Sequence, residues 1–308
     1  MIQEHPTAAG AGTVRYHDDE ILVRTADAVE VENVLTAYGR IVARTEVTPA
    51  FRRYRFADVS LDLVLELLGP LARRNHVLSG APFQHGGLPD PGDPPPQPTP
   101  VPTVPTVPVA VLDGDATGTH ATTVATVVRG RTDAADVHVV ALLNKLGRCS
   151  EADLAAALCR LEPQVRVVNL SLGGYTADGL ASPVLRDALG RALDDPRRLV
   201  VAAAGNDGNS ADPFWPAAFA GSDAPWSDRV VAVAAHDGRA AYPWSNSGSW
   251  VTVAAPGAGE DWSGTSFATP WVTGELVRHL ADGCAVDEAL ARVLSDGTSE
   301  VVDPKDLG

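Results

Sequence analysis

Short apolar runs recur through the second half of the chain, and amphipathic stretches separate them. The runs predict strands near residues 109–113, 137–144, 165–172, 198–205, 229–236 and 250–255. The stretches between them predict helices near residues 120–129, 150–160, 181–194 and 265–281. Alternating strands and helices are typical of an α/β domain, so we predict a mostly parallel sheet covered on both faces over residues 109–308.

The first part of the chain has a different order of elements. Apolar patterns predict strands at 20–25, 40–48, 50–58 and 76–80 and helices at 29–39 and 60–74. Strand, helix, strand, strand, helix, strand is the ferredoxin-like order, which predicts a small α+β domain over residues 19–86. We expect residues 1–18 to form a flexible N-terminus.

Proline separates the two parts. From Leu88 to Pro108 it occupies nearly every second or third position. Such a run favours an extended, semi-rigid spacer, so we interpret residues 87–108 as a linker.

Four polar residues stand where predicted elements begin or end. Asp113 and Asn206 each follow an apolar run, while His120 and Ser266 each stand at the start of a predicted helix. In open α/β sheets such positions gather along one rim, where ligands bind. A serine hydroxyl becomes a nucleophile when a base takes its proton, a third group orients that base and a donor awaits the oxyanion. The four residues supply these groups.

With these residues in the chain order Asp, His, Asn, Ser, and with the motif SGTSFATP around Ser266, the chain resembles the subtilisin-like serine proteases, the subtilase family. The resemblance implies a three-layer α/β catalytic domain after the α+β domain. It also implies that Asp113 orients His120, that His120 acts as base and then acid, and that Ser266 forms the acyl-enzyme. Asn206 would donate its side-chain amide to the oxyanion.

The resemblance extends to substrate binding. Ser171, Leu172 and Gly173 would pair with an extended substrate, and Ala204 and Gly205 would lie beside it. The segment with Asp207, Asp212, Phe214 and Trp215 resembles the family's first specificity pocket. Two interpretations stay open: an acidic rim that accepts Lys or Arg, or bulky aromatic residues that narrow the pocket and favour smaller side chains.

The segment between the aspartate and the histidine is shorter than in typical family members. Only GDATGT lies between Asp113 and His120, and six residues span at most about 20 Å, which still lets the two side chains meet. Asp115 is an alternative carboxylate. Relatives often carry a calcium loop in this segment. We expect no cofactor in the chemistry and no metal in the site, and a structural calcium ion stays an open alternative.

Composition narrows the partners. The formal net charge of −15 argues against nucleic acid and anionic membranes, which bind basic surfaces. The first 20 residues lack the basic start and apolar core of a secretory signal, so we expect a cytoplasmic location, with export by another route left open. The three cysteines, an odd number, predict no disulfide framework.

The sequence therefore predicts a serine endopeptidase that hydrolyses protein or peptide substrates by limited proteolysis. The alternative is a catalytically silent, subtilase-like peptide-binding protein. The resemblance implies that residues 19–86 are a propeptide-like domain that assists folding and then inhibits the protease. A permanently attached recognition module is the competing interpretation.

Overall fold

The computed structural model describes residues 1–80, 106–114, 118–259, 262–295 and 301–307. Most of the expected proline-rich linker therefore lies outside the described residues. Its last two residues, Val107 and Pro108, already belong to the first strand of the second part.

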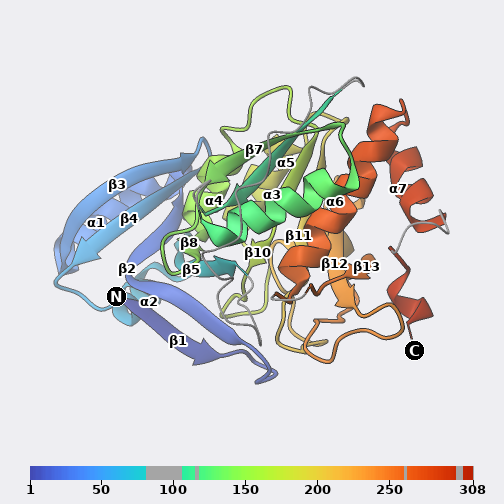
Figure 1. Cartoon of the computed structure of the whole chain (residues 1–308). Helices are drawn as coiled ribbons and strands as arrows, with labels where there is room; N and C mark the ends of the chain where they lie inside the picture. The colour runs from blue at the N-terminus through green and yellow to red at the C-terminus, as the bar shows by residue number, and fades with distance from the viewer. Residues whose placement is uncertain (81–105, 115–117, 260–261, 296–300, 308) are drawn as a thin grey trace.

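A parallel six-stranded sheet forms the centre of the second part (Figure 1). Most residues of its four inner strands are apolar and buried on both faces because helices cover both, which is the usual pattern of a parallel sheet. The prediction of an α/β fold with a mostly parallel sheet is confirmed. In spatial order the strands are β13 (Val253–Pro256), β12 (Val230–His236), β11 (Leu199–Ala203), β9 (Val167–Leu170), β6 (Val107–Asp113) and β7 (Ala135–Ala141).

Successive residues of β6 point to opposite faces and enter two different cores. Val109 and Val111 pack into one core, with the helices α3 (Thr119–Arg131), α6 (Thr265–Ala281) and α7 (Val286–Ser295). Ala110 and Leu112 pack into the other, with α4 (Glu151–Leu158) and α5 (Pro183–Ala192). The sheet is therefore the middle of three layers. The sequence did not predict α7.

The first part has the predicted ferredoxin-like order. Its antiparallel strands lie in the order β5-β2-β4-β3, with two helices between them in the chain. The elements are β2 (Thr13–Arg24), α1 (Ala28–Tyr38), β3 (Arg40–Thr48), β4 (Phe51–Ala57), α2 (Leu61–Leu68) and β5 (Ala72–Gly80).

Two expectations for this part need correction. Residues 1–18 do not form a flexible terminus: β1 (Ile2–Pro6) pairs antiparallel with β2 to make a hairpin. The second helix ends at Leu68 rather than at residue 74, because Gly69 has a positive φ of 50° and Pro70 cannot continue the hydrogen-bond ladder.

The two parts share one antiparallel sheet as well as one apolar core. Strand β5 lies between two short strands of the second part, β8 (Arg148–Ser150) and β10 (Leu172–Gly173), and pairs antiparallel with both. Buried residues of α1 and α2 belong to the same apolar cluster as those of α4 and α5. The first part is thus docked on the second through backbone pairing and apolar packing.

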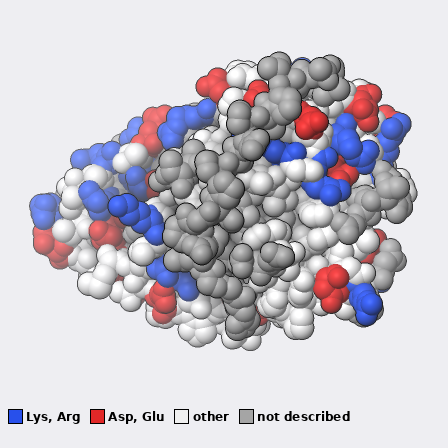
Figure 2. Space-filling model, viewed as in Figure 1, with Lys and Arg blue, Asp and Glu red and all other residues white. Residues whose placement is uncertain are grey.

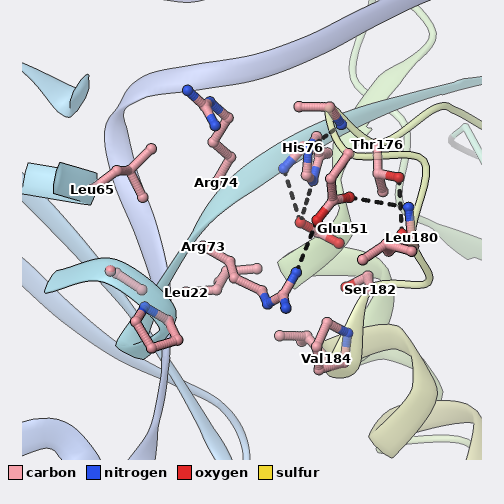
Figure 3. Close-up of a pocket in the computed structure, with 16 residues that line it drawn as sticks. Leu22, Leu65, Arg73, Arg74, His76, Glu151, Thr176, Leu180, Ser182 and Val184 are labelled. Atoms are coloured by element: carbon pink, nitrogen blue, oxygen red, sulfur yellow. Dashed lines mark hydrogen bonds and ion pairs between the residues drawn. The ribbon is translucent and has the colours of Figure 1, made fainter. Parts of the chain in front are cut away.

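Polar contacts at the start of α4 reinforce this docking (Figure 3). The Glu151 carboxylate, 2% exposed, accepts hydrogen bonds from the backbone N–H of His76 at 3.0 Å and from its Nδ1 at 2.9 Å. Nε2 of His76 accepts a hydrogen bond from the Ala177 backbone at 3.1 Å, which assigns the ring proton to Nδ1. A cavity of about 350 Å³ lies along this seam between the two parts.

Charged side chains of both signs lie on the visible face of the first part (Figure 2). In the view of Figure 2, Lys and Arg are interspersed with Asp and Glu over this part, so this face offers no continuous basic surface. Among the helices of the described residues, none has the length and apolar character needed to cross a membrane. All three cysteines are free thiols, and burial raises the pKa of Cys149.

Candidate active site

Asp113 and His120 meet despite the short segment between them. Asp113 is the last residue of β6 and is 1% exposed, and His120 is the second residue of α3. His120 Nδ1 lies 2.8 Å from Asp113 Oδ1 and 2.9 Å from Oδ2. An ionised carboxylate only accepts hydrogen bonds, so the pair assigns a proton to Nδ1 and makes Nε2 the basic nitrogen. The alternative carboxylate, Asp115, lies outside the described residues.

Ser266 stands in the first turn of α6 and is fully buried. Its Oγ donates a hydrogen bond to the Ser171 carbonyl at 2.9 Å, and Ser171 Oγ donates to the Ser266 carbonyl at 2.8 Å. The His120 ring lies 5.5 Å from the ring of Phe267, the next residue, which places His120 beside the serine. The Ser266 hydroxyl is therefore bonded to Ser171, not to His120.

Asn206 presents a side-chain N–H₂ group beside the start of α6. Its Oδ1 accepts hydrogen bonds from the backbone N–H and the hydroxyl of Thr265, both at 2.9 Å. These bonds fix the amide so that Nδ2 faces away, and among the described residues this buried Nδ2 has no hydrogen-bond partner. A Cβ at Gly264, whose φ is +151°, would lie 3.2 Å from Nδ2. The backbone N–H of Ser266 belongs to a first helical turn, where amides lack intrahelical acceptors. The arrangement can therefore offer two donors to one oxyanion.

The five expected substrate-binding residues divide into two walls. Leu172 and Gly173 pair with Gly80 and Ser79 of β5, next to Ser171. On the other wall, the Ala204 carbonyl accepts a hydrogen bond from Asn246 at 2.8 Å, and the Gly205 N–H donates to Thr265 Oγ1 at 3.2 Å. The first wall thus pairs with an extended strand, β5. The backbone of the second wall is fixed by hydrogen bonds to the side chains of Asn246 and Thr265.

Sequence reasoning missed the residues that fix these walls. Asn246 contacts two segments: Nδ2 donates to Ala204 and to the Tyr175 hydroxyl, and Oδ1 accepts from the backbone of Asp207 and Asn209. Thr265 orients Asn206. Nothing in the local sequence around Asn246 separates it from an ordinary turn asparagine, because its partners are far away in the chain.

The two acidic residues near the pocket are engaged in other contacts. Asp207 Oδ2 accepts a hydrogen bond from the Tyr175 hydroxyl at 2.9 Å, and burial raises the pKa of its carboxyl group. Asp212 accepts hydrogen bonds from the backbone of Ala9, in the first hairpin, and from Asn209 Nδ2 at 3.1 Å. These contacts weaken the interpretation of an acidic rim that accepts Lys or Arg. Over the described ranges, His, Cys, Asp and Glu side chains form no cluster of three or more that could hold a metal ion.

Residues 110–282 match the sequence model of the Subtilase family. No curated protein sequence matches the chain.

Among the solved structures that resemble this chain are three proteases. Fervidolysin from Fervidobacterium pennivorans, a keratinolytic enzyme related to subtilisin, is 18% identical, with a TM-score of 0.62 over 87% of this chain; the match spans 55% of fervidolysin. The prenylagaramide maturation protease PagA is 27% identical, with a TM-score of 0.52 over 66% of this chain and 87% of PagA. The epidermin leader peptide processing serine protease EpiP from Staphylococcus aureus is 15% identical, with a TM-score of 0.59 over 90% of this chain and 92% of EpiP.

Proposed function

The chain belongs to the subtilase family of serine proteases, whose model matches residues 110–282, and on that premise we propose that it is a serine endopeptidase using Asp113, His120 and Ser266. The observation that carries this proposal is the His120 imidazole, held through Nδ1 by the buried Asp113 carboxylate beside a serine at a helix start. A substrate for this chemistry is a protein or peptide bound as an extended strand, and no cofactor takes part.

In the proposed reaction, the Ser266 hydroxyl turns from the Ser171 carbonyl towards His120 Nε2, a change of about 120° between staggered rotamers. Oγ attacks the scissile carbonyl carbon while Nε2 takes the hydroxyl proton, and the C=O π pair moves onto oxygen. Asn206 Nδ2 and the Ser266 N–H donate to that oxyanion. Collapse breaks the C–N bond, and His120 returns the proton to the leaving amine. A water molecule then attacks the acyl-enzyme in the same way, with His120 again taking and returning a proton, and the carboxylic acid product leaves.

We propose that the first part of the chain inhibits the protease and assists its folding. Supporting this, β5 occupies the space between β8 and β10, where an extended substrate would pair with the same backbone groups. A Cβ at Gly80, its last residue, would lie 3.7 Å from His120 Cε1. A strand that ends beside the general base excludes a substrate from the same place.

Limited proteolysis is the proposed mode of action. PagA, described as a maturation protease, is 27% identical and supports a role in trimming a precursor peptide. Backbone pairing with β10 supplies affinity with little demand on the substrate sequence, so selectivity comes from side-chain pockets.

Mass spectrometry of the full chain with and without a fluorophosphonate probe tests the proposal. Wild type and Ser222→Ala, a serine outside the site, should gain one adduct on Ser266, and Ser266→Ala should gain none. His120→Ala should form the adduct at least about 100-fold more slowly, because a general base contributes about 10²–10⁴. A folded wild-type chain that gains no adduct even on prolonged exposure, which gives β5 time to open, would support the silent peptide-binding alternative instead.

A further inference from the structure

The register of β5 shows where the side chain before the scissile bond would go. Gly80 faces Leu172 and Ser79 faces Gly173, so the next position of a strand in this register faces Ser171. The Ser171 carbonyl is the group bonded to Ser266 Oγ. A substrate strand in the same register would bring the carbonyl of that position near the nucleophile, and the space beside it lies between Gly173 on one wall and Gly205 on the other.

Phe214 already fills this space. A Cβ at Gly173 would overlap the Phe214 ring at Cε1 and lie 2.8 Å from Cδ1. A Cβ at Gly205 would lie 3.0 Å from Cγ and Cδ2 of the same ring. The ring, 5% exposed, is thus wedged between the two glycine backbones beside the catalytic centre.

Contacts behind the ring hold it in place. Tyr175 packs edge-on against Phe214, with ring centroids 5.1 Å apart. The Tyr175 hydroxyl is fixed in turn, because it donates to Asp207 Oδ2 at 2.9 Å and accepts from Asn246 Nδ2 at 3.0 Å. Trp215, the next residue, exchanges two backbone hydrogen bonds of 2.8 Å with Gly174. Phe214 therefore has no free space behind it into which a large substrate side chain could push it.

We propose that Phe214 closes the bottom of the pocket for the residue before the scissile bond, so that this protease cleaves after glycine, alanine or serine. The inference rests on the proposed endopeptidase function and adds its substrate class. The charge of the pocket agrees with it, because the Asp207 and Asp212 carboxylates are already hydrogen-bonded to Tyr175, Ala9 and Asn209, which leaves less of their charge for a Lys or Arg side chain of a substrate.

A competition assay tests the inference in the full chain. We would mix peptides of the form Val-Leu-Ser-Gly-X, which extend the sequence of residues 77–80, with X as Ala, Ser, Leu, Phe or Lys before a chromogenic or mass-tagged amine. Each ratio of kcat/KM is independent of how many clefts are open, because all peptides compete for the same enzyme. The variants are Phe214→Gly and Phe214→Ala, and the matched control is Phe219→Leu, a fully buried change among Trp215 and Trp226.

One methylene in an apolar pocket changes kcat/KM by about 10- to 200-fold. Wild type and Phe219→Leu should therefore favour Ala over Leu, Phe and Lys by at least about 100-fold. Both Phe214 variants should reduce the Ala-to-Phe ratio by at least about 10-fold. Wild-type cleavage after Phe or Lys as fast as after Ala overturns the inference, as does an enzyme labelled at Ser266 that leaves the alanine peptide intact. Absence of labelling at Ser266 overturns the proposed function itself.

Discussion

Replacing Leu78 by alanine tests whether the first part of the chain closes the cleft. Leu78 lies in β5 opposite Cys149 of β8 and is 2% exposed. A Cβ at Gly174, on the far wall, would lie 3.1 Å from Leu78 Cδ2. This side chain is therefore buried by the docking of β5 between the strands of the second part, and its removal weakens that docking.

The size of the effect follows from the burial. Truncating a buried leucine to alanine costs about 2.7–5.0 kcal/mol, as the transfer term and the cavity term add. At 1.36 kcal/mol for each factor of ten, the lower value corresponds to about a 100-fold larger open fraction. The rate at which a fluorophosphonate labels Ser266 is proportional to that open fraction, so Leu78→Ala should be labelled about 100-fold faster than wild type.

The control is the same substitution on the outer surface. Leu63 lies on α2 and is 39% exposed, so Leu63→Ala should change the labelling rate by less than about threefold. Urea denaturation of all three proteins shows whether the first part remains folded. A Leu78→Ala protein that is folded and labelled at the wild-type rate would refute the reasoning, because β5 would then not limit access to Ser266.

Three further changes test individual residues. Asn206→Ala should lower kcat by about 100- to 1000-fold with KM nearly unchanged, the loss found when one oxyanion donor is removed from subtilisin; a shift in KM alone would contradict this. Asp113→Asn should lower kcat by about 10⁴-fold through the wrong histidine tautomer, and a smaller loss than in Asn206→Ala would argue against the assignment. Burial raises the pKa of Asp207, so the folded state binds its proton more tightly than the unfolded state, and stability falls as the pH rises from about 4 through that raised pKa. Asp207→Asn should remove this part of the pH dependence in melting experiments between pH 4 and 8, and an unchanged profile would contradict it.

The sequence predicted the elements that depend on local pattern. The apolar run before Asp113 predicted a strand, and residues 107–113 form one. The helix predicted at 265–281 has the same bounds in the structure. These elements are predictable because a two-sided buried strand and a long helix each leave a clear periodicity.

Contacts between distant segments were not predictable in this way. Strand β1 is short and mostly polar, so its pairing with β2 leaves little apolar signal in the sequence. Thr265 orients Asn206 across 59 positions of sequence, and Asn246 reaches Tyr175 across 71. Such roles depend on the tertiary fold and not on the residues nearby. For the same reason the sequence could not decide between an acidic pocket and a narrow aromatic one, because only the fold brings Phe214 between Gly173 and Gly205.

The placement of β5 between β8 and β10 has a consequence for how the protein responds to its own concentration. If β5 is the proposed inhibitor, it competes in the intact chain with a substrate at a fixed local concentration, of the order of millimolar for a tethered segment, however much the protein is diluted. A cut between Gly80 and Val107 turns this into an encounter of two separate molecules. The intact chain should therefore have a specific activity independent of its concentration, whereas the cut protein should become more active on dilution. Activation would then be a matter of mass action after a single backbone cleavage.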